Sequence, residues 1–284
     1  MTAAAPSVGV PVPPRPGRVH RMGRTVRLYI PAIVVFVAGI AVWELLIRTF
    51  DVRAFILPAP SAIAGALVDN WGEGRWSLFE SARTTLLEAV GGLVIGTGAG
   101  LVIAFAVARW ANARDTVLPF AVAANAIPII AIAPIFNAWF GVTNPLSKMM
   151  IAALLVFFPV MINVTRGLTQ VEPSALELMR SYAASDWTIL RKVRLPNALP
   201  FFLTALKVAT TLSLIGAIVG EYFGGSSTVI GRVVVQSASA LRFDVTWAAI
   251  LLAAVTGIAF YLAIAALERV LIPWHASIRA DEPG

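Results

Sequence analysis

Residues 245–267 read VTWAAILLAAVTGIAFYLAIAAL, a run of 23 residues without a charged side chain. An α-helix rises about 1.5 Å per residue, so roughly 20 apolar residues cross the hydrocarbon core of a bilayer. This run therefore predicts a membrane-spanning helix. The whole chain agrees, because 58% of its 284 residues are hydrophobic and only 13% are charged. That composition is too apolar for an ordinary soluble domain of this length.

Five further stretches are long and apolar enough to cross a membrane: 29–47, 86–108, 117–140, 146–164 and 198–219. Together they predict an all-α integral membrane protein with six transmembrane helices in a domain over residues 29–272. Residues 1–28 hold five prolines and five arginines and are expected to form a disordered basic arm. Residues 273–284 are expected to be a short tail.

Lys and Arg are retained on the cytoplasmic side of membrane proteins, so their distribution among the loops predicts orientation. With a cytoplasmic N-terminus, the inner segments hold 14 of these residues, the outer segments hold 7, and Lys207 lies inside the fifth span. This bias predicts that both termini are cytoplasmic. The net charge of +7 calls for no nucleic-acid partner, because the basic residues lie in short loops between apolar runs.

Glycines and prolines within the spans predict how the helices pack. Glycine recurs every fourth residue at positions 92, 96 and 100, and again at 216, 220 and 224, which predicts two smooth strips for close helix contact. In the third span, Pro128 and Pro134 each remove a backbone donor, so this helix is expected to bend beside a cavity. Residues 61–71 are too short to cross and predict an interfacial helix capped by Ser61.

The longest polar stretch after the arm covers residues 165–197, between the fourth and fifth spans. Ser174 and Glu177 have the spacing of a capping box that starts a helix. Ser185 or Asp186 can cap a second helix. The stretch therefore predicts two short helices on the cytoplasmic side.

The two helices are expected to join at Ala183-Ala184, and Pro196 is expected to end the second helix after Leu195. They would expose a mixture of aromatic, aliphatic and basic side chains: Arg180, Tyr182, Trp187 and Leu190. Such a mixture suits docking in a groove on a partner protein.

A longer pattern in this stretch resembles a family motif. It runs Glu177-Leu178-Met179-Arg180-Ser181-Tyr182-Ala183, then nine residues, then Val193-Arg194-Leu195-Pro196. This pattern resembles the EAA loop of binding-protein-dependent ABC importer permeases, with the same spacing. In that family the loop is the coupling helix that sits in a cleft of the cytoplasmic ATPase.

Other short segments extend the resemblance over most of residues 29–272 and are similar to the branch that imports nitrate, sulfonates and taurine. They are Trp43-Glu44-Leu45-Leu46, Leu57-Pro58-Ala59-Pro60-Ser61, Ile127-Pro128, Trp139-Phe140-Gly141, Ser147-Lys148 and Glu221. The resemblance implies a type I ABC importer permease fold in the bacterial cytoplasmic membrane. It also implies a set of ATPase-coupling residues: Glu177, Arg180, Ser181, Tyr182, Ala183, Ala184, Ser185, Trp187, Leu195 and Pro196.

Three residues depart from the family pattern. Leu178 and Met179 stand where the family usually has alanines, and Ala183 stands where it has glycine. If the turn needs a left-handed residue, Ala183 costs roughly 1 kcal/mol. Two alternatives follow, a helix that runs through this point or a slightly strained loop. For Glu177, closing the capping box and contacting the ATPase are both open.

Import against a gradient needs an energy source that this chain does not supply. The residue before each of its three lysines, Lys148, Lys192 and Lys207, is not glycine, so the chain has no GxxxxGK[ST] phosphate loop. The chain itself is therefore expected to be neither an enzyme nor a cofactor protein, with ATP and Mg²⁺ bound by partner ATPases. The resemblance implies two ATPase subunits, a second permease copy and an extracytoplasmic solute-binding protein as partners.

Polar side chains within spans are expected to matter more than average. The candidates for a substrate pathway are Asn125, Asn137, Asn163 and Lys207. In the alternative, each asparagine bonds a neighbouring helix and Lys207 extends toward the cytoplasmic interface.

Two other functions compete with a permease. An ion-coupled secondary transporter needs carboxylates near mid-membrane, whereas Glu44, Glu88, Glu221 and Glu268 are expected near span ends. An intramembrane enzyme needs a nucleophile with a base, or a metal, yet the sequence has no cysteine and both histidines lie in the terminal segments. The cargo is open among a sulfonate, taurine, nitrate, an aromatic acid and a vitamin precursor.

Overall fold

The structure is a computed structural model that describes residues 18–124 and 128–272, and the regular elements within these residues are all helical. They are α1 (Arg18–Thr49), α2 (Pro60–Asp69), α3 (Leu78–Arg109), α4 (Ala111–Ala124), α5 (Ile129–Phe140), α6 (Pro145–Thr169), α7 (Pro173–Ser181), α8 (Asp186–Ile189), the π-helical turn η1 (Leu190–Arg194), α9 (Leu195–Phe223), α10 (Ile230–Ser239) and α11 (Phe243–Leu271). Five of these segments are long and apolar enough to cross a membrane: Ile30–Thr49, Leu78–Arg109, Pro145–Thr169, Asp186–Phe223 and Phe243–Leu271.

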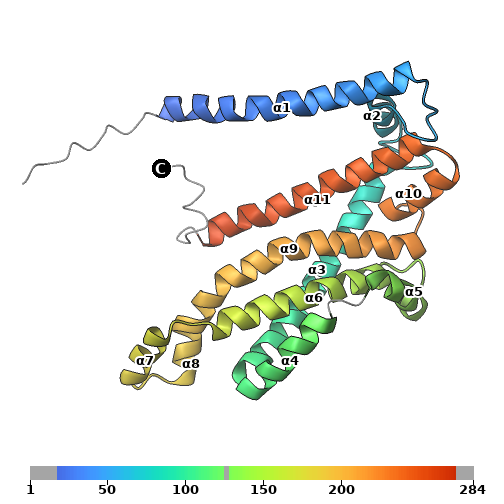
Figure 1. Cartoon of the computed structure of the whole chain (residues 1–284). Helices are drawn as coiled ribbons and strands as arrows, with labels where there is room; N and C mark the ends of the chain where they lie inside the picture. The colour runs from blue at the N-terminus through green and yellow to red at the C-terminus, as the bar shows by residue number, and fades with distance from the viewer. Residues whose placement is uncertain (1–17, 125–127, 273–284) are drawn as a thin grey trace, which may run out of the picture.

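Helices α3, α6 and α9 form the centre of the bundle and pack on one another more extensively than the other pairs. The buried residues there are mostly small or branched, such as Val156 and Val160 of α6 and Ala205 and Ala209 of α9. Figure 1 shows the two ends of the bundle. One end carries α2, α5 and α10, and we call it the α10 end; the other carries α7 and α8, and we call it the α7 end.

Both glycine strips lie at helix contacts, as the sequence predicts. A Cβ added at Gly92 or Gly96 would collide with α6, and one added at Gly216 would lie 2.6 Å from the Cα of Ala152, also in α6. The absence of side chains therefore lets α3 and α9 approach α6 from two directions.

Helix α1 lies at the edge of the bundle, and its segment in the membrane is almost wholly exposed. Polar contacts hold its end to α2: the backbone N–H of Ser61 donates to Glu44 Oε2 at 3.0 Å, and the Ser61 hydroxyl donates to Glu44 Oε1 at 2.7 Å. The expectation that Ser61 caps the interfacial helix is wrong. The cap residue is Ala59, and Pro60 takes the first helical position, which suits its fixed φ.

The expected single helix over 117–140 is two helices, α4 and α5, with residues 125–127 outside the description. Pro128 is the cap residue of α5. Proline has no backbone N–H to donate, so it interrupts a continuous helix. A sixth crossing thus stays a prediction. At the other terminus, α1 begins at Arg18, within the stretch expected to be a disordered arm. The expected tail over 273–284 lies outside the described residues.

Replacing Gly96 by alanine should destabilise the fold, because the new methyl group would collide with the backbone of α6. Overpacking of this kind costs about 1–3 kcal/mol. We expect Gly96→Ala to lower the temperature at which the detergent-purified chain loses its monodisperse peak in size-exclusion chromatography. Gly98→Ala is the control in the same helix, because nothing lies within 4 Å of its Cβ position. Equal stability of the two variants would contradict the packing described here.

Candidate coupling loop at the α7 end

Helix α7 projects from the bundle, and none of its residues is buried. Its start differs from the expected capping box. Glu172 is the cap residue and gives no side-chain hydrogen bond, and Pro173 occupies the first helical position. Proline is pre-organised for that position, where the backbone N–H would have no partner within the helix. Ser174 is therefore already helical, and the capping role considered for Glu177 is not formed.

The turn after α7 is strained at Ala183. Its backbone is left-handed, with φ of 51°. The N–H of Ala184 donates to the carbonyl of Met179 at 3.0 Å, and the N–H of Ala183 donates to that of Arg180 at 2.9 Å. These two bonds make a Schellman motif, whose left-handed position glycine usually fills. Of the two alternatives drawn from the sequence, the strained loop is therefore the one observed.

The second helix begins as expected and ends differently. Ser185 is the cap of α8, and its hydroxyl accepts from the N–H of Thr188 at 3.3 Å. Pro196 does not end the helix, since α8 continues through the π-helical turn η1 into α9. Pro196 lies in the first turn of α9, where a missing N–H costs little. The chain therefore enters the membrane without a break.

Several of the predicted coupling residues present exposed side chains on this projection. Tyr182 is 77% exposed and Trp187 is 66% exposed, and Leu178, which is not among the predicted coupling residues, is 56% exposed beside them. Exposed as well are Glu177, Arg180, Ser181, Ala183, Ser185 and Pro196, whereas Ala184 and Leu195 are half-buried. Large apolar groups gathered on a polar projection are typical of a surface that a partner covers.

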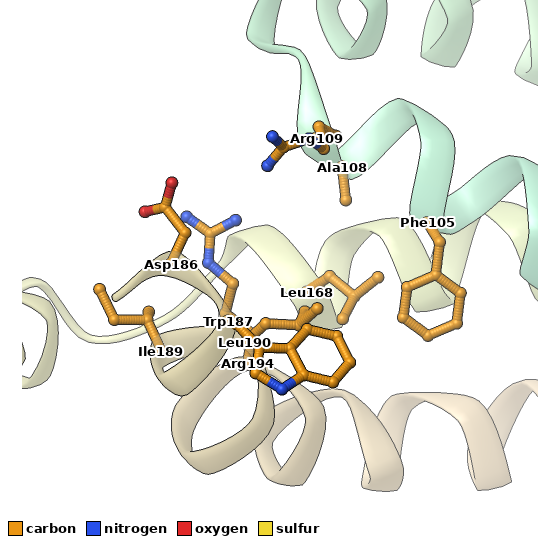
Figure 2. Close-up of a pocket in the computed structure, with 9 residues that line it drawn as sticks. All are labelled: Phe105, Ala108, Arg109, Leu168, Asp186, Trp187, Ile189, Leu190 and Arg194. Atoms are coloured by element: carbon orange, nitrogen blue, oxygen red, sulfur yellow. The ribbon is translucent and has the colours of Figure 1, made fainter. Parts of the chain in front are cut away.

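A pocket of about 650 Å³ lies beside this projection. Figure 2 shows its lining side chains, which come from the ends of α3 and α6 and from α8 with η1: Phe105, Ala108, Arg109, Leu168, Asp186, Trp187, Ile189, Leu190 and Arg194. The pocket combines apolar side chains with two guanidinium groups and the Asp186 carboxylate. Sequence reasoning did not group Phe105, Arg109 and Leu168 with the loop, because they lie on other helices.

The three predicted pathway residues that the structure describes do not meet in one place. Asn137 is buried, and its Nδ2 donates to the Gly220 carbonyl of α9 at 3.3 Å. Asn163 donates within its own helix, to the Pro159 carbonyl at 2.8 Å. Lys207 pairs with Glu268 of α11 at 2.7 Å. Asn125 lies outside the described residues.

A family model described as the binding-protein-dependent transport system inner membrane component matches residues 92–274. The chain belongs to this family. It is a multi-pass inner membrane permease component of an ABC importer, a class that works with an ABC ATPase and a binding protein. The matched region includes the loop, the pocket, all of α6 and α9, and α3 from Gly92 onward.

Curated relatives match this permease over most of their length. A probable ABC transporter permease protein of Haemophilus influenzae is 31% identical, over 84% of this chain and 95% of that protein. The formylaminopyrimidine transport permease protein of Halalkalibacterium halodurans is 31% identical, over 84% and 94%. The putative aliphatic sulfonates transport permease protein of Bacillus subtilis is 30% identical, over 93% and 92%. A solved inward-facing methionine ABC transporter matches with a TM-score of 0.49 and 19% identity, over 71% of this chain and 95% of that chain.

Replacing Ala183 by glycine should relax the turn, because glycine adopts a left-handed backbone without the Cβ clash. The gain is up to about 1 kcal/mol. We expect Ala183→Gly to slow amide hydrogen exchange at positions 183 and 184, measured by mass spectrometry on the purified chain. Ala184→Gly is the matched control, because the backbone there is not left-handed. Greater protection in the control would show that the strain lies elsewhere.

Lys207→Met should lower thermal stability, because it leaves the buried Glu268 carboxylate without its partner. The double variant Lys207→Met/Glu268→Gln should recover most of the loss, since no unpaired charge remains. Melting curves of the two variants and the wild type in detergent test this. No loss in the single variant would mean that the ion pair does not stabilise the α9–α11 contact.

Proposed function

We propose that this permease forms the solute path of an ATP-driven importer and that α7 and α8 dock into its ATPase. The observation that carries the proposal is the projection itself. Helix α7 buries no residue within this chain. On and beside it, three large side chains with apolar surface are mostly exposed: Leu178, Tyr182 and Trp187. A groove on a partner would remove these side chains from water.

The partner must supply the energy, because the sequence has no phosphate loop. ATP and Mg²⁺ are bound by the ATPase, and the permease itself catalyses nothing. Two permease copies pair, and each docks one ATPase subunit. Both termini and the α7 end face the cytoplasm, α4 and α5 together make a sixth crossing, and the loaded binding protein docks at the α10 end.

The cargo is a small organic or inorganic solute such as a sulfonate, taurine, nitrate or a vitamin precursor. Relatives named for aliphatic sulfonates, taurine, riboflavin and formylaminopyrimidine support this range. We keep Asn125, Asn137, Asn163 and Lys207 as pathway residues, exposed to solute when the bundle changes state.

Docking of the ATPase would couple nucleotide binding to the bundle through η1, which leads from α8 directly into α9. Arg109 and Arg194 would offer charge-assisted hydrogen bonds to acidic groups of the ATPase at the pocket. Closure of two ATPases would then turn the projections and move the permease pair between inward-facing and outward-facing states.

Trp187→Ala should weaken ATPase binding by about tenfold or more, because a buried aromatic anchor contributes about 2 kcal/mol or more to an interface. The measurement is a titration of the ATPase onto the permease in nanodiscs, with solute uptake in vesicles as the second readout. Trp139→Ala is the matched control, since Trp139 is 71% exposed but lies in α5 at the α10 end. Unchanged ATPase affinity of Trp187→Ala would contradict the assignment, as would an equal loss in Trp139→Ala.

A further inference from the structure

Three charged side chains are buried together at the α10 end. Glu88 of α3 is 3% exposed, and Lys148 of α6 and Glu221 of α9 are fully buried. The two carboxylates interact electrostatically with each other and with the Lys148 ammonium. Charged groups inside a membrane protein are costly and mark functional positions. The coupling loop does not use them, because it lies at the other end of the bundle.

Glu221 and Thr85 cap the N-terminus of α10 from two other helices. The N–H of Gly231 donates to Glu221 Oε2 at 2.6 Å, and the N–H of Ile230 donates to Thr85 Oγ1 at 3.0 Å. The cap residue of α10, Val229, has no side-chain acceptor. The first N–H groups of a helix have no partner within the helix, and a carboxylate there also interacts favourably with the helix dipole. Helices α3 and α9 therefore supply the cap that α10 lacks.

Gly231 makes this contact possible. A Cβ at that position would lie 2.6 Å from the Cβ of Glu221 and 2.8 Å from the carbonyl oxygen of Ile218. Any other residue would push α10 away from α9. The close approach of α10 and the cap by Glu221 thus depend on the same position.

Lys148 fixes the neighbouring turn against the same part of α9. Its ammonium donates to the carbonyl of Val142, between α5 and α6. Its stem lies beside Gly220, where an added Cβ would be 3.2 Å from Lys148 Cγ. The end of α9 therefore contacts α10 through Glu221 and the start of α6 through Gly220.

We propose that Thr85 and Glu221 are positioning residues that clamp α10 to α3 and α9, and that Lys148 holds the same part of α9 to α6, so that docking at the α10 end moves the central helices and not α10 alone. This inference rests on the proposed function, in which the binding protein docks at this end. The apolar side of α10, with Ile230 and Val233, packs separately against α2, α3 and α11. Weakening the polar clamp therefore leaves α10 in place but loosely connected to α9.

The test uses the complex of permease, ATPase and binding protein in nanodiscs. ATPase rates are measured across binding-protein concentrations, and amide hydrogen exchange is measured over residues 228–240. Thr85→Val removes the acceptor for Ile230 with little change in volume, and Glu221→Gln removes the charge that caps Gly231. Thr84→Val, one residue earlier in α3 and outside the cap, is the matched control.

In Thr85→Val and Glu221→Gln, we expect exchange at Ile230 and Gly231 to accelerate by about tenfold, the value of one hydrogen bond to a buried or charged group. The maximal rate stimulated by binding protein should fall, while the basal rate and the half-saturating binding-protein concentration stay unchanged. Weaker docking would instead raise the half-saturating binding-protein concentration, and general destabilisation would also lower the basal rate. Thr84→Val should match the wild type in every readout.

Charge balance gives an independent arm. Lys148→Met leaves Glu88 and Glu221 facing each other without the ammonium, so it should impair stimulation most. Adding Glu88→Gln replaces the Glu88 carboxyl group by an uncharged amide beside Glu221 and should restore part of the stimulated rate.

Full stimulation in Thr85→Val and Glu221→Gln despite faster exchange would overturn the clamp, as would basal and stimulated rates that fall in equal proportion. A wild-type complex that the binding protein fails to stimulate would contradict the proposed function instead. The exchange arm still decides in that case whether Thr85 and Glu221 hold α10.

Discussion

Close contact between the backbones of α3, α6 and α9 is the constraint on which the rest of the structure depends. Lipid is as apolar as leucine, so helices in a bilayer gain little from hydrophobic burial against each other and depend on close packing. Gly92, Gly96 and Gly216 allow that packing on two sides of α6. Once the three axes are fixed, the two ends of the bundle are fixed as well, and both ends carry polar groups that lipid would not accept.

The two ends handle their helix termini differently. At the α7 end, the last carbonyls of α7 are satisfied within the turn itself, and the backbone of Ala183 carries the strain. At the α10 end, the first N–H groups of α10 are satisfied by Thr85 and Glu221 from other helices. The first arrangement stays together when the projection moves, because it is local. The cap at the α10 end is lost or rearranged if α10, α3 and α9 shift relative to one another.

Elements with a periodic or local signal could be predicted from the sequence. The apolar runs predicted five of the six expected spans correctly, the four-residue spacing predicted the glycine strips, and Ser185 predicted the cap of α8. Predictions failed where proline allows two outcomes. Pro60, Pro173 and Pro196 each lie in the first turn of a helix, whereas the sequence pattern favours Ser61 and Ser174 as caps and Pro196 as a stop.

The cluster of Glu88, Lys148 and Glu221 could not be predicted from the sequence, because its members come from three helices. Each residue taken by itself is explained by its place near the end of a span. Lys148 follows a loop, and Glu88 and Glu221 lie toward span ends, so each was expected near the membrane surface. Gly231 was the available signal, since a glycine near a helix start indicates close approach of another backbone or side chain. The partner that approaches, Glu221, is set by tertiary packing that the sequence does not state.

Helix α9 joins the two ends without interruption. It runs for 29 residues from Leu195, directly after η1, to Phe223, two residues beyond Glu221. At about 1.5 Å per residue it covers about 40 Å, the thickness of a bilayer with its headgroups. A rotation imposed on α8 therefore reaches the cap of α10 along one hydrogen-bonded element. The same geometry lets a load on α10 reach α8, since a rigid helix transmits displacement in both directions.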